Sequence, residues 1–369
     1  MRIASALPLL LSLVAGFASP TLGAEQTSSK SCRQAGGGQG DTAEVVAALG
    51  KLRPLLSEPQ RAALEHALNY DNAIHWSNLP LGIVPRTGLR LGDLDATQAA
   101  AARKVFEAAF SACGLKLLDE IRLADDWLIP FDKRPIGWGG GNYFLSVLGT
   151  ADAKSPWMLQ LGGHHLAYNF TFNGRLPGAT PLFFGSEPVS FEMKGVTYAP
   201  LDAQSTAMSK LAAAVATHRQ ARLSGTFTDV VKGVVVTGTP GQSMSGGIDT
   251  GFPQSYPNGT VDRGVPVSAM TKPQRLRLRE AIESFASFPG NAISAPLLAA
   301  YLDPTAFNET YVGYAGATEL SAKGSYVRID GPRVWMELVV QPAVAHPEQL
   351  HYHALWRDKQ SDYGGEVRH

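Results

Sequence analysis

Two histidines near the end of the chain have the type and spacing that metal chemistry requires. The segment HYHALWRDKQSDYGG (351–365) contains His351 and His353, two of only nine histidines in 369 residues. Residues two apart on a strand project from the same face, so both imidazoles would lie side by side and could ligate one ion. The aromatic and apolar residues of this segment favour a strand, whereas a helix would turn the two rings apart.

A second pair, His164 and His165, lies in the segment QLGGHHLAYN. Neighbouring residues on a strand face opposite ways, so both rings can reach one ion only at an irregularity such as a bulge. The two glycines before the pair permit such an irregularity. We therefore expect one of these histidines to be a metal ligand and the other to support or pack against the site.

Glu337 is the strongest carboxylate candidate, because it stands inside the apolar run VWMELVV. A buried charge is unfavourable unless it is paired or bound to a metal, so we predict a catalytic role for Glu337 and keep it as a further candidate ligand. An ion pair with Arg328 on the preceding predicted strand is the alternative. Glu187, in GSEPV, is a second acidic candidate, although an acid in a turn before proline is usually solvated.

The charged residues after the last predicted strand complete the candidate site. Asp358 or Asp362 could accept the far N–H of a metal-bound imidazole, as carboxylates commonly do. Arg357 could hold an anionic or carbonyl group of a substrate. We therefore predict that Arg357 and Asp358 are catalytic, with a charged loop beyond the strand as the alternative for each.

A serine nucleophile is the rival chemistry. Ser243 and Ser245 lie among glycines in GTPGQSMSGGIDTG. The nucleophile elbow needs glycine two residues before and two residues after the serine, and neither serine meets both conditions. A glycine-rich surface loop explains this segment better.

The elements that must position these residues change in kind along the chain. Residues 41–127 are predicted to be mainly helical, with capping-box pairs at Ser57/Gln60 and Asp95/Gln98. Residues 128–369 are richer in strand-forming segments, with a tight hairpin at Lys194-Gly195, a helix from Asp202 and a buried strand at DVVKGVVVTG. Helices first and strands later, without regular alternation, predict an α+β fold: a helical N-terminal region packed on a mainly antiparallel sheet that includes the C-terminal strands. We treat 41–369 as a single large domain.

The N-terminus and the composition predict an exported protein. Residues 1–24 have the features of a signal peptide, and residues 25–40 are predicted to be a flexible leader. The location would then be secreted or periplasmic, where Cys32 and Cys113 could pair, although two free thiols remain the alternative. Lysine plus arginine equal aspartate plus glutamate at 32 each, which argues against nucleic acid as a partner. No later apolar run is long enough for membrane insertion.

The segments WMLQLGGHHLAYNFTFNG, TPLFFGSEP and HYHALWRDKQSDYGG together resemble the domain-of-unknown-function family number 3500. Its members typically carry a Gly-His-His segment, a Thr-Pro…Phe-x-Gly…Pro segment and a C-terminal His-x-His followed by Trp-Arg-Asp and Asp-Tyr-Gly. Many relatives continue to a His-Tyr, where this chain has only His369. The resemblance implies that the histidine pairs belong to one pattern, and it implies no particular reaction.

These residues predict a divalent metal bound by His351, His353 and one of His164 and His165. Histidine and carboxylate ligands without thiolate suit zinc, which we favour, or copper, iron or manganese. Zinc would make a hydrolase acting on a small or polymeric polar substrate, with an aromatic cleft lined by Tyr143, Trp157 or Trp335. The alternative is a secreted metal- or ligand-binding protein without turnover, and the oligomeric state is left open.

Overall fold

The structure is a computed structural model that describes residues 38–132, 136–176, 178–231, 253, 255–346 and 348–367. The predicted signal peptide and nearly all of the predicted leader lie outside the described residues. So do Cys32, both serines of the rival site and most of the strand predicted at DVVKGVVVTG. Those predictions remain predictions, and the pairing of Cys32 with the buried Cys113 is among them.

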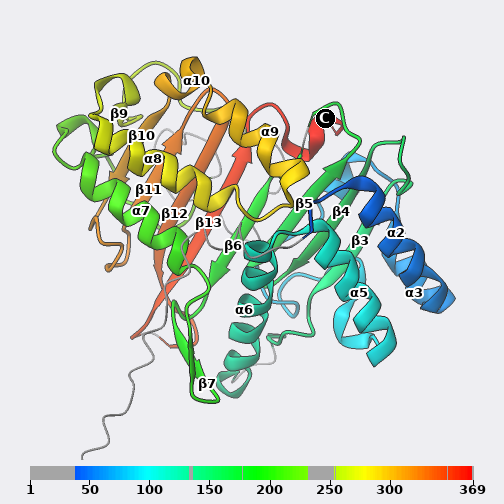
Figure 1. The fold of residues 1–369 in the computed structure, drawn as a ribbon. Helices are drawn as coiled ribbons and strands as arrows, with labels where there is room; N and C mark the ends of the chain where they lie inside the picture. Colours follow the sequence, from blue (N-terminus) through cyan, green and yellow to red (C-terminus); the bar gives the residue numbers. More distant parts are fainter. Residues whose placement is uncertain are drawn as a thin grey trace, which may run out of the picture.

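A mostly antiparallel sheet runs through the centre of the molecule (Figure 1). In the described residues it has eleven strands in the order β1-β3-β4-β5-β6-β13-β12-β11-β10-β9, with β2 beside β3. Only the β1–β3 pair among them is parallel. The strands are β1 (Glu65–His66), β2 (Leu89–Arg90), β3 (Phe144–Leu148), β4 (Trp157–Gly163), β5 (Leu166–Phe172), β6 (Leu182–Ser186), β9 (Val265–Pro266), β10 (Tyr311–Ala315), β11 (Tyr326–Asp330), β12 (Val334–Pro342) and β13 (Leu350–Asp358).

The longer helices pack on one face of this sheet and bury a shared apolar core with it. In Figure 1 the N-terminal helices lie beside β3–β5, while α7 and α8 run across β10–β13. The helices are α2 (Thr42–Leu52), α3 (Glu58–Leu64), α4 (Tyr70–Ala73), α5 (Ala96–Ala109), α6 (Ala112–Leu128), α7 (Asp202–Val215), α8 (Lys272–Phe285), α9 (Asn291–Tyr301) and α10 (Pro304–Asn308). This arrangement confirms the predicted α+β class.

Local sequence signals explain several boundaries. The capping boxes predicted at Ser57/Gln60 and Asp95/Gln98 start α3 and α5. The predicted hairpin at Lys194-Gly195 joins β7 (Phe191–Met193) to β8 (Val196–Tyr198), and both turn residues have positive φ. These parts of the fold therefore follow from short-range chemistry.

Strand alternation gives the sheet two different faces. On β12, the helix-covered core contains Val334, Met336, Leu338 and Val340. On β13, the same core contains Ala354 and Trp356, so the alternate residues face the other way. Those alternate residues on β13 are His351, His353, Leu355 and Arg357. The buried polar side chains of His351, His353 and Arg357 therefore lie on the face that the long helices do not cover.

No helix in the described part of the chain combines the length and the apolar character that crossing a membrane requires.

Candidate metal centre

His351 and His353 lie on β13, on one face, as the sequence predicts. Both side chains are buried, each with 5% of its surface exposed, and their ring centroids are 4.4 Å apart. The spacing of two residues on a strand is therefore sufficient to bring the two imidazoles together.

His164 and His165 form the two-residue turn between β4 and β5, where strand residues with a bulge were expected. Gly163 pairs with Leu166 across the hairpin, and His165 has a φ of 59°. Its N–H donates to the Asn78 carbonyl at 3.0 Å, and its carbonyl accepts from the Gly185 N–H at 2.8 Å. Because the chain reverses here, the two rings do not project to opposite faces. They stack, with centroids 3.7 Å apart and planes 29° apart.

Three imidazoles from these two segments converge on one point: His165, His351 and His353. Each offers a ring nitrogen, and the three nitrogens lie within 4.8 Å of one another. His165 Nε2 and His351 Nε2 are 2.8 Å apart. Two nitrogen ligands of a tetrahedral zinc ion are about 3.3 Å apart, so a small separation of these rings would admit the ion. The buried Nε2 of His353 has no hydrogen-bond partner among the described residues, which fits a nitrogen reserved for a metal.

Carboxylates face the far side of two of these rings. Asp229 Oδ1 lies 2.9 Å from His353 Nδ1, and Glu187 Oε2 lies 3.7 Å from His351 Nδ1. Glu187 is itself held in place, because its Oε1 accepts the backbone N–H groups of Val344 at 2.6 Å and Ala345 at 2.5 Å. At hydrogen-bond distance from His353 Nδ1, Asp229 selects the tautomer that leaves Nε2 free for a metal, which is the usual support of a histidine ligand. Glu187 is too far from His351 Nδ1 for a hydrogen bond, and that nitrogen has no hydrogen-bond partner among the described residues.

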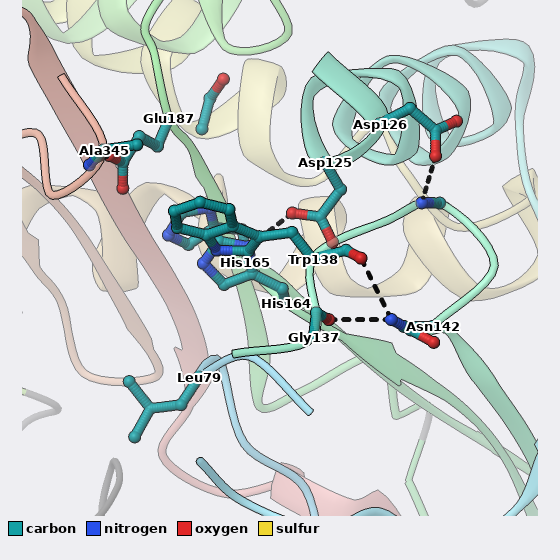
Figure 2. A network of polar contacts seen from close by, with 12 residues as sticks. Leu79, Asp125, Asp126, Gly137, Trp138, Asn142, His164, His165, Glu187 and Ala345 are labelled. Carbon is teal, nitrogen blue, oxygen red and sulfur yellow. Dashed lines mark hydrogen bonds and ion pairs between the residues drawn. The ribbon is translucent and has the colours of Figure 1, made fainter. Parts of the chain in front are cut away.

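His164 makes a separate pair with Asp125 of α6. The His164 Nδ1 and Asp125 Oδ1 atoms are 2.5 Å apart, and both side chains are buried. Figure 2 shows Asp125 reaching from the helix to His164, beside His165. The Tyr143 hydroxyl also donates to the His164 carbonyl at 2.6 Å. His165 thus belongs to the three-nitrogen group, and His164 lies against it in a supporting position.

Burial favours the neutral form of two ligand candidates, His165 and His351. Removal from water, followed by the repulsion of neighbouring imidazoles, lowers the pKa of His165 and of His351 well below the usual value. Neutral imidazole is the form that binds a metal ion.

A glycine makes the close approach of these rings sterically feasible. A Cβ at Gly185 on β6 would lie 2.7 Å from the Tyr352 carbonyl oxygen, 3.0 Å from His165 Cδ2 and 3.1 Å from His353 Cδ2. Any side chain at this position would therefore push against two of the three imidazoles.

The cluster opens onto a cavity of about 300 Å³. Its polar wall contains all four predicted histidines together with Asn78, Glu187, Thr228, Asp229 and Gln341. Its apolar wall contains Leu79, Pro80, Ile83, Ile136, Trp138 and Val344. A small ligand with both polar and apolar parts matches these walls.

Residues 39–365 match the family model described as "Protein of unknown function (DUF3500)". The chain belongs to the DUF3500 family. The matched range includes both histidine segments, so the resemblance seen in the sequence is confirmed. No curated protein and no solved structure matches the chain.

The three residues predicted to be catalytic in this DUF3500 chain do not line the cavity. Glu337 is fully buried, and its carboxylate accepts from the Tyr326 hydroxyl at 2.7 Å, the Val231 N–H at 2.8 Å and the Trp335 indole N–H at 3.0 Å. These contacts give the charge neutral partners away from the histidines, so burial in an apolar strand has a structural explanation.

Arg357 and Asp358 are also engaged elsewhere. Arg357 is four residues along β13 from His353, a separation of about 13 Å, and its Nη1 lies 3.2 Å from Asp362 Oδ2. Asp358 lies on the opposite strand face and accepts from Tyr301 Oη at 2.9 Å and Arg333 Nη2 at 2.7 Å. These contacts stabilise the fold. The carboxylates that face imidazoles belong to Asp125, Glu187 and Asp229.

Several site residues of the DUF3500 chain were not found by sequence reasoning. Asp125, Asp229 and Asn78 come from a helix and two loops, and no spacing links them to the histidines. Glu187, which was weighed as a solvated turn residue, is buried in the cavity wall. Tyr143, Trp157 and Trp335, the aromatic residues predicted to line the cleft, lie outside the cavity wall, whereas Trp138 is part of it.

Proposed function

We propose that this protein is an exported enzyme that uses a divalent metal, with zinc favoured, to hydrolyse a small or polymeric polar substrate. One observation carries the proposal: three buried imidazoles from two distant segments converge at the wall of a cavity. A zinc ion with three protein ligands keeps a fourth position for water or substrate, which is the arrangement of catalytic rather than structural sites.

The roles of the residues follow from their contacts. His165, His351 and His353 would hold the metal, Asp229 orients the His353 ring through a hydrogen bond, and Glu187 places a negative charge near the His351 ring. When bound, the metal supplies an activated water molecule at neutral pH.

His164 is the candidate proton carrier, because Asp125 holds its Nδ1 and leaves Nε2 to accept or deliver a proton. The pairing resembles the carboxylate–imidazole unit of hydrolases, in which the acid fixes the tautomer of the base.

The alternative is a metal- or ligand-binding protein without turnover. One observation favours it: His164 stacks on His165 at 3.7 Å, close enough to become a fourth ligand after a change of rotamer. Four protein ligands would close the coordination shell and leave no position for a substrate.

Metal analysis tests the site. The purified mature protein should bind one equivalent of zinc, and the variant His351→Ala/His353→Ala should remain folded but bind none. The control His66→Ala/His218→Ala removes two histidines that contact Ala63 and Gln274 instead, and it should bind zinc as the wild type does. A wild-type protein that takes up no zinc, copper, iron or manganese would refute the proposal.

A single variant separates the enzyme from the binding protein. Under the enzyme proposal, His164→Ala keeps the zinc and loses turnover of ester and amide substrates. If His164 closes the shell, the same variant loses zinc affinity by at least tenfold, and the enzyme proposal fails.

Export is tested by the N-terminus of the protein recovered outside the cytoplasm. The signal-peptide proposal expects a mature chain that begins after Ala24. An unprocessed chain retained in the cytoplasm would contradict it.

A further inference from the structure

Asn78 is an anomaly in the cavity wall. Its side chain is 1% exposed, yet neither Nδ2 nor Oδ1 has a hydrogen-bond partner among the described residues. An amide buried without partners destabilises a protein, so such groups are rare unless a ligand satisfies them. Asn78 is one of the residues that line the cavity beside the histidines.

The backbone on both sides of Asn78 is fixed in place. The Asn78 carbonyl accepts the N–H of His165 at 3.0 Å, which joins this residue directly to the metal candidate. The guanidinium of Arg86 donates to the Ser77 carbonyl at 2.8 Å and also to the Leu79 carbonyl. A polar group held by its neighbours in this way is preorganised to bind a ligand.

A second unpaired donor lies in the same wall. The indole Nε1 of Trp138 is buried and has no partner within the described part of the chain. Asn78 and Trp138 together present donors and one acceptor, with apolar side chains such as Leu79 and Ile83 around them. Among the described lining residues none is a lysine or an arginine, while Glu187 and Asp229 are acidic. The wall therefore offers no cationic side chain to an anion, and the neutral polar groups of Asn78 and Trp138 suit an uncharged ligand group.

We infer that Asn78 recognises a primary carboxamide or a lactam, with Trp138 donating to a further oxygen of the same ligand. This inference names the substrate class of the cavity and rests on the proposed function for its turnover. In a primary or cyclic amide, the C=O and an N–H lie on the same edge of the group, so Asn78 Nδ2 and Oδ1 can both be satisfied at once.

Other ligand classes satisfy Asn78 less completely. A carboxylate or an ester offers acceptors only and leaves Asn78 Oδ1 unpaired. An open-chain secondary amide is trans, so its C=O and N–H point to opposite sides and cannot both meet one asparagine. The cavity, at about 300 Å³, also limits the bound portion to a compact group. Ordinary peptide bonds are therefore poor partners for this residue.

Binding of three matched probes to the full-length mature protein, incubated with zinc beforehand, tests the inference. The probes are 2-piperidone, its N-methyl derivative, which lacks the N–H, and δ-valerolactone, which replaces the N–H by oxygen. Ligand-observed NMR or calorimetric titration should show that the wild type binds 2-piperidone at least tenfold more tightly than either analogue. Asn78→Leu should bind all three within about twofold of one another, and Asn291→Leu, an exposed control, should behave as the wild type.

Stability supplies an independent readout of the same residue. If Asn78 is kept for a ligand, Asn78→Leu removes two unpaired buried atoms and should raise the melting temperature of the ligand-free protein by about 1–3 °C. A structural role predicts a lower melting temperature instead, and that result would overturn the inference. Equal binding of the three probes by the wild type would overturn it as well.

Zinc content is measured on the same samples, so the two proposals can fail separately. Protein that binds zinc but does not distinguish the probes retains the metal site and refutes amide recognition. Protein that binds no zinc but still prefers 2-piperidone through Asn78 refutes the metal proposal and supports the amide site.

Discussion

Gly185→Ala would test whether β6 sets the position of the metal ligands. The added methyl group would lie 2.7 Å from the Tyr352 carbonyl oxygen, a backbone atom that the paired strands keep in place. It would also meet His165 Cδ2 at 3.0 Å and His353 Cδ2 at 3.1 Å. These contacts are closer than ordinary van der Waals distances, so the backbone or both rings must shift.

The expected magnitudes follow from this geometry. Overpacking of a core destabilises by about 1–3 kcal/mol, and the preference of a strand for alanine over glycine offsets about 0.5–1 kcal/mol. The net fall in the free energy of unfolding should therefore be at most about 2.5 kcal/mol. Zinc affinity should fall about 10–100-fold, the range observed when the groups that orient metal ligands are lost.

The assay compares Gly185→Ala with Gly50→Ala by urea unfolding and by competition with a zinc-binding dye. Gly50 is exposed on α2, and a Cβ there meets nothing within 4 Å. The control should therefore gain up to about 1 kcal/mol from helix propensity and bind zinc unchanged. If Gly185→Ala keeps both the stability and the zinc affinity of the wild type, the rings are not confined by β6, and the proposed geometry is wrong.

Three further predictions concern the carboxylates. Asp229→Asn should lower zinc affinity about 10–100-fold, because the His353 Nδ1–H then loses its charged acceptor. A dye competition assay measures this affinity, and an unchanged value would show that Asp229 does not support the metal site. Glu337→Gln should leave zinc affinity unchanged but lower the free energy of unfolding by about 1–3 kcal/mol. The reason is that the new amide N–H₂ group would face a hydrogen-bond donor where the carboxylate oxygen accepted one. Loss of zinc in this variant would instead indicate that Glu337 is a metal ligand. Burial raises the pKa of Asp362 to about 6, although Arg357 opposes this shift. Since the folded state then holds a proton that the unfolded state releases near pH 4, the contribution of Asp362 to stability decreases as pH rises from about 4 to 6, by up to roughly 3 kcal/mol. Urea unfolding across this range should show the wild type losing stability relative to Asp362→Asn, and parallel curves would contradict the assignment.

Parts of the structure governed by short-range patterns could be predicted from the sequence. Alternation on β13 and β12 places His351 and His353 on one face of the sheet. The other face carries Val334, Met336, Leu338 and Val340 of β12. Capping pairs such as Ser57/Gln60 mark helix starts because both hydrogen bonds form within one turn. Each of these features depends on residues close together in the chain.

The rest of the site depends on contacts between distant residues that no sequence pattern predicts. His164 and His165 follow two glycines and a strand-like run. These residues are compatible both with a strand that contains a bulge and with a tight turn between two strands. The pairing of Gly163 with Leu166 in the structure establishes that His164 and His165 form a turn. Asp125 reaches its histidine from α6 across 39 positions of sequence, and no periodicity encodes that contact.

Glu337 shows the limit of reasoning from an unusual residue in an apolar strand. The sequence revealed correctly that its charge is buried, but not which groups surround it. Its described partners include a tyrosine hydroxyl, an indole and a backbone N–H from three different segments. Burial of a charge therefore identified a residue that needs partners, without identifying those partners as catalytic or structural.

The separation of the metal ligands along the chain constrains when a metal can be acquired. His165 and His351 are 186 positions apart, and His351 and His353 belong to β13. A polypeptide that emerges from its N-terminus cannot assemble these three imidazoles until the residues up to His353 are available. If the protein is exported unfolded, the ion must then come from the compartment where folding finishes, so metal supply at the destination would determine how much of the protein is active.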